Sequence, residues 1–400
     1  AGNIRTLDKV IRREFQLVEG DAFNASKLRR SRTRIRNLGF FEKVDIEQVP
    51  GTAPDRTVIN ATVEEKPTGQ VSLGAGFSSS VGILGDVQLR ETNFLGRGQD
   101  VKLQLQVAAE ASQIDFSFTE PYFLDKDLRV GFDLFHFTRD LQDTSSFDIS
   151  RTGGSLRAGY DITEQFSESW RYTIRQTTID SVDTDASTLV QAQQGDSLLS
   201  EVGHIFAYDR RDQRIKPTSG YLLRLATDFA GLGGDLQHLR NVLDGATYYS
   251  PRDQWIFSLT GKAGYIAGIG KDVLLSERFF VGGDNVRGFA TSGLGPRDTA
   301  TGDALGGNYM YAGSLALKFP SGLPEEFGVS GRIFTDIGSS WDLSPVNATT
   351  ADSKSLRMGI GTGISWDSPF GPLGVDFAYP VLKEDYDEEE FVRINFGARF

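Results

Sequence analysis

The chain has 400 residues, with 45 glycines, no cysteine, 11% aromatic residues and a formal net charge of −12. This acidic balance argues against nucleic acid as the main partner, because binding to a phosphate backbone relies on Lys and Arg. No stretch approaches the about 18 consecutive apolar residues that a membrane-spanning helix needs. A membrane β-barrel would escape such a search, because each strand alternates lipid-facing and lumen-facing residues.

Residues 1–67 predict a small α/β domain that begins with two helices. Thr6 is a candidate N-cap for the first helix, and apolar residues follow it at helical spacing. A second helix is predicted to begin near Asn24 or Ser26, and Gly39 suits its C-terminal cap. Six basic residues lie on its outer face: Lys27, Arg29, Arg30, Arg32, Arg34 and Arg36. A solvated face and a surface for a partner or for lipid headgroups both remain open for this basic helix, residues 27–36.

Two strands follow, over 41–49 and 57–63, and the Pro50-Gly51 pair and Pro54 separate them. Two helices on a two-stranded sheet form a marginal core. A further strand before Ala1 would complete it, and the chain opens with no signal peptide. We therefore expect the sequence to be a piece of a longer protein, with a truncated first domain.

Residues 68–400 predict an all-β transmembrane barrel of 16 antiparallel strands. Apolar and polar residues alternate strictly over 101–107 and 113–119, which gives each strand one apolar face. An even strand number is typical of single-chain bacterial barrels. The predicted strands are 69–78, 85–95, 99–109, 112–123, 127–140, 150–163, 166–179, 197–209, 219–230, 236–249, 253–267, 308–319, 327–341, 354–366, 372–382 and 390–400.

The connections between these strands support a barrel. Every long connection falls on one side of the sheet, at 180–196, 268–307, 342–353 and 383–389. Short periplasmic turns and long outer loops produce this sorting in outer-membrane barrels, whereas a soluble β-sandwich, the alternative, gives no reason for it. The acidic residues of 384–390 are interpreted as a solvated outer loop.

Several motifs along the chain resemble the BamA family of outer-membrane protein assembly factors. They include Asn37-Leu38-Gly39-Phe40-Phe41, Asn93-Phe94-Leu95-Gly96-Arg97-Gly98, Glu120-Pro121-Tyr122-Phe123, Asp209-Arg210-Arg211-Asp212, Val286-Arg287-Gly288-Phe289 and Trp366-Asp367-Ser368-Pro369-Phe370-Gly371. Their order over the whole chain makes the resemblance specific. It implies that residues 1–67 are the last periplasmic POTRA domain of a series and that residues 68–400 are the barrel.

The 268–307 loop is long enough to demand a functional explanation. The resemblance implies that it folds back into the barrel lumen, with Val286, Arg287, Gly288 and Phe289 as its motif. It also implies that Arg287 pairs with Asp336, and a confined cation does need such a partner. An acidic residue that the family places on the twelfth strand is Ala316 here, so we expect Asp336 to carry more of this lock. The alternative is that Arg287 contacts only solvent or backbone.

The resemblance further implies that the protein inserts other barrel proteins into the membrane without ATP, through a lateral seam between its first and last strands. Unpaired strand edges are costly in lipid, so a parted seam would serve as a template for an incoming strand. Leu73 and Phe396, or their register neighbours, are expected to face each other across it. The seam candidates are Gln70, Val71, Leu73, Gly74, Gly76, Ile394, Phe396, Gly397 and Phe400. Ordinary barrel strands, and local membrane thinning, are the alternatives to gating.

The expected partners are unfolded outer-membrane proteins as clients, assembly-complex lipoproteins bound through the POTRA domain, and the lipid bilayer. The expected location is the bacterial outer membrane, with the POTRA domain in the periplasm. A polypeptide transporter of the TamA or two-partner secretion type is the main rival, and a passive porin is a weaker one. No enzyme, cofactor or metal site is predicted, because the three histidines lie on separate strands and no Gly-x-Ser-x-Gly motif occurs.

Overall fold

The computed structural model describes residues 1–52, 56–368 and 371–397. Within these ranges, none of the helices combines the length and the apolar character needed to cross a membrane. By backbone proximity the chain divides into two compact units. One comprises residues 1–72, 87–104 and 116–132, and the other comprises 73–86, 105–115 and 133–400.

The small N-terminal domain has the predicted order of elements, which are α1 (Asp8–Arg12), α2 (Ala25–Asn37), β1 (Phe41–Pro50) and β2 (Thr57–Glu65). The two strands pair antiparallel. Helix α2 buries Ile35 completely. The core that the helices share with the sheet comprises Val10, Ile11, Ile35, Phe40, Phe41, Val44, Ile46 and Val63.

The caps of these helices differ in one respect from the prediction. Thr6 as the N-cap of α1 is wrong: Leu7 holds that position and makes no side-chain capping bond. The Thr6 hydroxyl instead accepts a hydrogen bond of 2.8 Å from the Asn93 side chain. For α2 the predicted start is confirmed, since the helix begins at Ala25, and the Asn24 side chain caps it by accepting hydrogen bonds from two backbone amides of the first turn. Gly39 follows the helix with φ +75°, a conformation that favours glycine.

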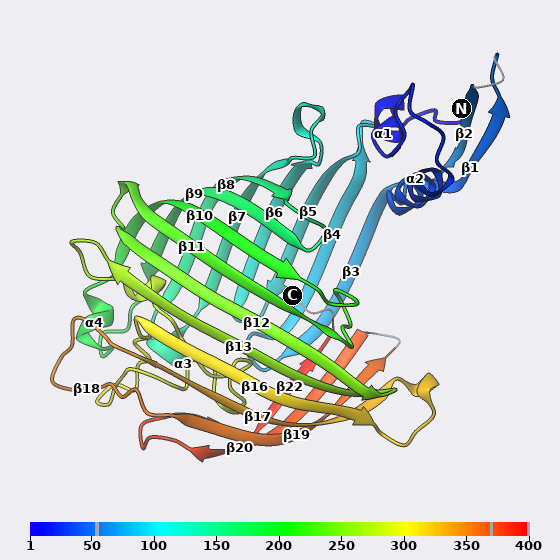
Figure 1. Cartoon of the computed structure of the whole chain (residues 1–400). Coiled ribbons are helices and arrows are strands. Elements are labelled where there is room, and N and C mark those ends of the chain that lie inside the picture. Colours follow the sequence, from blue (N-terminus) through cyan, green and yellow to red (C-terminus); the bar gives the residue numbers. More distant parts are fainter. Residues whose placement is uncertain (53–55, 369–370, 398–400) are drawn as a thin grey trace. The chain divides into compact units, whose positions relative to one another are not determined.

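Sixteen antiparallel strands of the described chain close into one barrel, which confirms the predicted fold class. Strands β8 to β13, then β16 and β17, lie side by side in chain order (Figure 1). The barrel strands are β3 (Gly69–Ser78), β4 (Gly82–Phe94), β5 (Gln99–Ala108), β6 (Ala111–Glu120), β7 (Arg129–Asp140), β8 (Asp148–Asp161), β9 (Phe166–Asp180), β10 (Gly195–Asp209), β11 (Gly220–Gly234), β12 (His238–Arg252), β13 (Trp255–Gly268), β16 (Tyr309–Pro320), β17 (Val329–Trp341), β19 (Arg357–Ser368), β20 (Gly371–Leu382) and β22 (Val392–Phe396).

Strands β17 and β20 each separate an exposed apolar face from a buried face that carries a carboxylate. On β17, Ile333 and Ile337 are exposed, whereas Asp336 between them on the other face is buried. Strand β20 repeats the pattern, with exposed Phe377 next to buried Asp376. Side chains alternate across a strand, so the exposed apolar set defines the face that would contact lipid.

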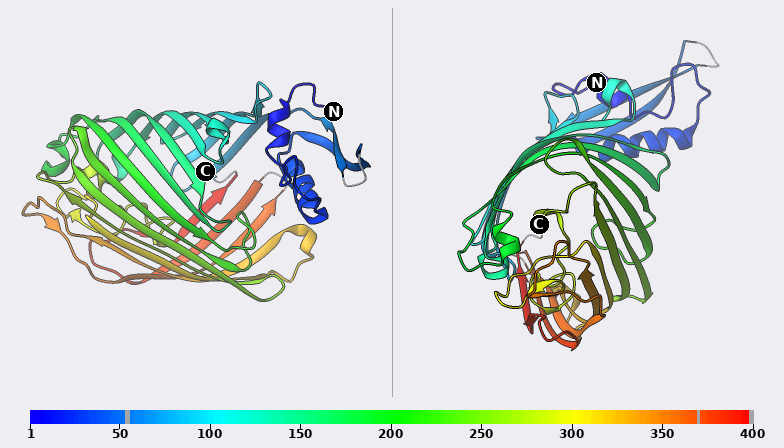
Figure 2. Two further views of the ribbon diagram at one scale, coloured as in Figure 1. Left: turned by 45° about the horizontal axis from the view of Figure 1, so that its top comes forward. Right: turned by 90° about the vertical axis from the view of Figure 1, so that its left-hand side faces the viewer.

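The loop between β13 and β16 is partly ordered by short elements, although the sequence predicted none there. It contains η2 (Leu275–Glu277), β14 (Gly288–Phe289) and β15 (Arg297–Asp298). Strand β14 pairs with β21 (Glu389–Glu390), and β15 pairs with β18 (Thr350–Ala351). In the right-hand view of Figure 2, parts of this loop (yellow) lie inside the curve of the green to red strands. The remaining short helices are η1 (Phe123–Asp125), α3 (Gln142–Ser145), α4 (Thr188–Gln191) and η3 (Glu325–Phe327).

Candidate functional site

The long loop is seated on the inner face of the barrel by apolar contacts. Val286 and Phe289 have no exposed surface. Both belong to a buried cluster that includes Val242, Ile266 and Met310 from barrel strands. This burial is typical of a packed core rather than of a surface loop.

Two strand glycines let the loop approach this closely. A Cβ at Gly338 would lie 2.5 Å from the Val286 side chain, and a Cβ at Gly359 would lie 2.0 Å from the Arg287 carbonyl oxygen. Neither distance is tolerable for a real side chain. The Val286 side chain therefore packs directly against β17, and the loop backbone at Arg287 lies directly against β19.

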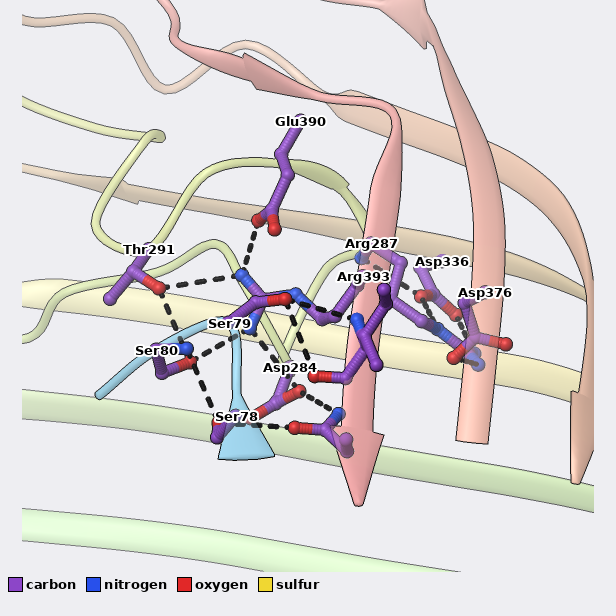
Figure 3. A network of polar contacts seen from close by, with 12 residues as sticks. Ser78, Ser79, Ser80, Asp284, Arg287, Thr291, Asp336, Asp376, Glu390 and Arg393 are labelled. Carbon is purple, nitrogen blue, oxygen red and sulfur yellow. Dashed lines mark hydrogen bonds and ion pairs between the residues drawn. The ribbon is translucent and has the colours of Figure 1, made fainter. Parts of the chain in front are cut away.

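Arg287 forms a bidentate ion pair with Asp336 of β17 (Figure 3). Its Nε donates to Oδ2 at 2.7 Å, and its Nη2 donates to Oδ1 at 2.9 Å. The Arg287 backbone amide also donates to Asp336, at 3.0 Å. Charge-assisted pairs of this geometry are among the strongest hydrogen bonds in proteins, so Asp336 holds both the side chain and the backbone of the loop motif.

Further groups surround the Arg287 guanidinium. Asp376 of β20 lies 3.5 Å from Nη1, and the Ser314 hydroxyl accepts from Nη2 at 3.1 Å. The Phe334 ring centroid lies 3.3 Å from Cζ. Burial alone would lower the pKa of Arg287, but the hydrogen bond and the charge of Asp336 outweigh it and raise that pKa.

Asp376 was missed by the sequence reasoning. It also receives two hydrogen bonds from Arg332, at 2.5 and 2.6 Å, so one carboxylate serves two arginines. Its place on the inner face of an alternating strand was a usable signal. Ala316, where the family resemblance led us to expect an acid, lies opposite Phe334 in the β16–β17 register.

The seam between the first and last strands is short in the described residues. Its register comprises the pairs Asn395–Ser78 and Phe396–Phe77. Beyond these pairs, the Ser79 amide donates to the Ile394 carbonyl at 3.0 Å. By contrast, the register of β9 and β10 runs without a break from Gly195 to Tyr208.

Glycines lie at the point where the seam strands converge. A Cβ at Gly76 would lie 2.3 Å from the Phe396 carbonyl oxygen. Gly397 has φ +105°, and a Cβ there would lie 2.8 Å from the Ala75 carbonyl oxygen. Glycine at both positions allows the two backbones to meet at a bend.

The other predicted seam residues are placed as follows. Val71 and Leu73 are exposed, at 71% and 77%, and Gln70 and Gly74 lie on the same strand, β3. Leu73 does not lie opposite Phe396, because the register places Phe77 there. Phe400 lies outside the described residues.

The acidic segment before the last strand is not a solvated loop, and that prediction is wrong. Asp387 forms an ion pair with Arg357, and both side chains are fully buried. The other carboxylates of 388–390 pair as Glu388 with Arg297, Glu389 with Lys383 and Glu390 with Arg393. The segment is therefore tied to β19, to the long loop and to β22.

A separate cluster joins the small domain to the turn after β6. Glu14 accepts a hydrogen bond of 2.9 Å from Arg34, which also donates to the Tyr122 hydroxyl at 3.0 Å. Arg13 stacks on the Tyr122 ring, 4.1 Å from its centroid. Burial alone would lower the pKa of Arg34, but Glu14 raises it. One residue of the basic helix thus has a defined structural role.

The three histidines do not form a common site. His136 contacts Thr152, His204 contacts Glu168, and His238 lies 3.5 Å from Glu201. In the parts of the chain that the structure describes, no three His, Cys, Asp or Glu side chains gather in a way that would hold a metal ion.

Two family models match the chain. Residues 93–400 match the Omp85 superfamily domain, and residues 1–66 match the POTRA model described as a surface antigen variable number repeat. These matches agree with the resemblance expected from the motifs.

Several of the similar proteins are outer membrane protein assembly factors by name. The BamA protein of Neorickettsia risticii is 33% identical over all of this chain and 54% of its own length. That of Nitratidesulfovibrio vulgaris is 29% identical over 99% of this chain and 50% of its own length. The chain thus spans about half the length of these curated relatives.

A solved structure confirms the fold. The crystal structure of BamA from Haemophilus ducreyi lacking POTRA domains 1–3 aligns with a TM-score of 0.87. The alignment covers 99% of this chain and 82% of that one, at 23% identity. At this identity the likeness concerns the fold.

Proposed function

The chain belongs to the Omp85 superfamily, and from this premise we propose that it assembles β-barrel proteins into the bacterial outer membrane. Residues 1–67 serve as a periplasmic POTRA domain and residues 68–400 as the membrane barrel. The clients are unfolded outer-membrane proteins. Lipoproteins of an assembly complex bind through the POTRA domain. The names of the most similar relatives support this role.

The pairing of the first and last strands is the observation that carries the mechanism. Only the pairs Asn395–Ser78 and Phe396–Phe77 join β22 to β3 within the described residues. Every backbone polar group in lipid needs a partner, and glycine weakens strand pairing, so we expect the barrel to open at the seam where Gly76 and Gly397 meet. The freed edge of β3 then offers its amides and carbonyls to an incoming strand.

No step of this mechanism requires ATP or a bound cofactor. Burial of the client's apolar face and pairing of its backbone in the bilayer drive insertion. The protein lowers the barrier by supplying an edge on which pairing begins. It acts as an assembly factor and not as an enzyme.

A client-folding experiment tests the proposal. The protein is reconstituted in liposomes, and an unfolded, chaperone-held barrel protein is added. Folding is followed by the heat-resistant gel shift of the client, with empty liposomes and liposomes holding an unrelated barrel as controls. Faster client folding supports the assembly role. No acceleration by a folded barrel contradicts it, and passage of the client through the lumen would favour a polypeptide transporter.

A crosslink tests the seam itself. The Ser78 hydroxyl donates to the Asn395 side chain at 3.1 Å, so these side chains face each other across the seam. Cysteines at Ser78 and Asn395 are expected to form a disulfide, and client folding should stop until a reductant is added. Cysteines at Ser167 and Ala207, which are register partners in β9 and β10, are the matched control. Full activity of the crosslinked seam would exclude lateral opening.

A further inference from the structure

We propose that Arg393 acts as a clasp, a side chain whose hydrogen bonds hold the seam between β22 and β3 closed. This closure depends on the long loop, residues 268–307, being seated inside the barrel. The proposal rests on the assembly function above and assigns a positioning role within it. Arg393 lies on β22, the last barrel strand, and only 4% of its side chain is exposed. Figure 3 shows it where the last strand, the segment after β3 and the long loop meet.

The guanidinium contacts three separate segments. Its Nη1 donates to the Ser80 hydroxyl at 2.8 Å, which crosses the seam to the residues after β3. Its Nη2 donates to the Thr291 hydroxyl of the loop at 3.3 Å and to Glu390. The Asp284 carboxylate, also from the loop, lies 3.5 Å from Nη1. One cation therefore joins the last strand to the segment after β3 and to the loop.

The residues around Arg393 leave space for its guanidinium and add bonds to the same junction. Gly283 has φ +63°, and a Cβ there would lie 2.9 Å from Arg393 Nη2. The loop thus leaves room for the guanidinium at that point. Asn395 strengthens the same junction, since its side-chain amide donates to Asp284 at 3.4 Å and its oxygen accepts from Ser78.

The clasp adds side-chain bonds to a seam in which two register pairs join β22 to β3 among the described residues. Hydrogen bonds to a charged group are stronger than neutral ones. Four of the contacts at this junction depend on Arg393. Loss of the guanidinium would leave Glu390 without its arginine and remove the side-chain bond to Ser80.

The loop lock and the clasp are close along the chain. Arg287, which pairs with Asp336, lies between Asp284 and Thr291, which both contact Arg393. Strand β14 of the loop also pairs with β21, directly before β22. A loop that leaves Asp336 would therefore withdraw its two partners from Arg393 and weaken the seam.

Distance measurements on the whole protein in nanodiscs test this coupling. Spin labels at Ile83 of β4 and Val381 of β20 flank the seam, and both side chains are exposed and outside the clasp. Arg393→Gln is expected to raise the population with longer label separations about tenfold, because one hydrogen bond to a charged group shifts an equilibrium by that order. Arg224→Gln removes an arginine that pairs with Asp244 far from the seam, and it should leave the distances unchanged.

A double-mutant cycle tests the dependence on the loop. Asp336→Asn should also lengthen the label separation, although Asp336 makes no contact with Arg393. Because both changes act through one junction, the double variant should add little to Arg393→Gln alone. Fully additive effects, or an Asp336→Asn protein with unchanged distances, would overturn the coupling.

The clasp itself is tested independently of client folding. A heat-modifiable gel shift checks that Arg393→Gln has folded. If it has not, Ser80→Ala removes only the hydroxyl across the seam and should still raise the open population. Unchanged distances in the folded variants overturn the clasp, even where the protein folds clients normally. If Arg393→Gln lengthens the label separations but the protein folds no client, the clasp is supported and only the proposed function is contradicted.

Discussion

Two buried carboxylates, Asp336 and Asp298, hold different parts of the long loop. Asp336 binds the side chain and backbone of Arg287 from inside the barrel. Asp298 is buried among the loops and accepts hydrogen bonds from Ser187 at 2.7 Å and Asn347 at 3.1 Å. Each can be changed to an amide of the same shape, which isolates the effect of charge.

Asp336→Asn should loosen the loop. Breaking a buried ion pair by removing one charge costs about 3–5 kcal/mol, and Asp376, 3.5 Å from Arg287, should keep the cost at the lower end. Trypsin cleavage within the loop, after Arg287 or Arg297, should become detectable in the folded barrel. Ser314→Ala removes only a neutral partner and should change cleavage far less. A folded Asp336→Asn barrel as resistant as the unmodified protein would exclude the lock.

Protonation of Asp298 at low pH should loosen the packing of the loops around it. Burial alone would raise the pKa of this carboxyl, but hydrogen bonds from Ser187 and other neighbours lower it from 3.8 to about 2. A lowered pKa means that the stabilisation is complete above the ordinary value and is lost as the pH falls toward 2. Pepsin cleavage near residues 299–303 should therefore rise between pH ~4 and ~2. In Asp298→Asn this rise should be absent; an identical pH profile in both proteins would contradict the assignment.

At the scale of single elements, β19 is shaped to receive the loop. Its inner face carries Gly359, Gly361 and Gly363 in alternation. A methyl group at Gly359 would meet the Arg287 carbonyl oxygen, and at Gly361 it would meet the Phe334 ring. Because these glycines have no side chains, the strand packs less well by itself, and the long loop can lie against it.

Gly359→Ala should displace the loop without breaking the barrel. A Cβ there would lie 2.0 Å from the Arg287 carbonyl oxygen, so the loop backbone must move. Gly261→Ala on β13 is the matched control, because a Cβ there meets nothing within 4 Å. Hydrogen exchange of residues 286–290 should speed up in the first variant and not in the second. Equal exchange in both variants would show that the close approach does not hold the loop.

At the scale of the whole molecule, stability depends on which face of a strand meets lipid. On β12, Leu243 is exposed on the outer face, and Ala246 lies on the inner face. Leu243→Arg should destabilise the barrel by about 2–4 kcal/mol, as a charge near the bilayer midplane does. Ala246→Arg should cost much less, since its side chain enters a polar lumen. Unfolding by guanidinium in lipid vesicles measures both, and equal losses would contradict the assignment of the two faces.

The barrel could be predicted from the sequence alone. Alternation with a period of two is a local property, so strand positions, their two faces and the number of strands were predictable without any knowledge of pairing. The cap residues Asn24 and Gly39 were predictable for the same reason, because each acts within one helical turn. The pairing of Arg287 with Asp336 came instead from the family resemblance, since the two residues are far apart along the chain.

The contacts between distant segments became visible only in the folded structure. Asp387 looked like one charge in a solvated run, yet it is buried against Arg357 of another strand. The partners of Asp376 and Arg393, and the register that sets Phe77 opposite Phe396, likewise leave no local pattern. The physical reason is that a carboxylate is solvated or paired according to what the fold brings near it, and a strand's register depends on its neighbour.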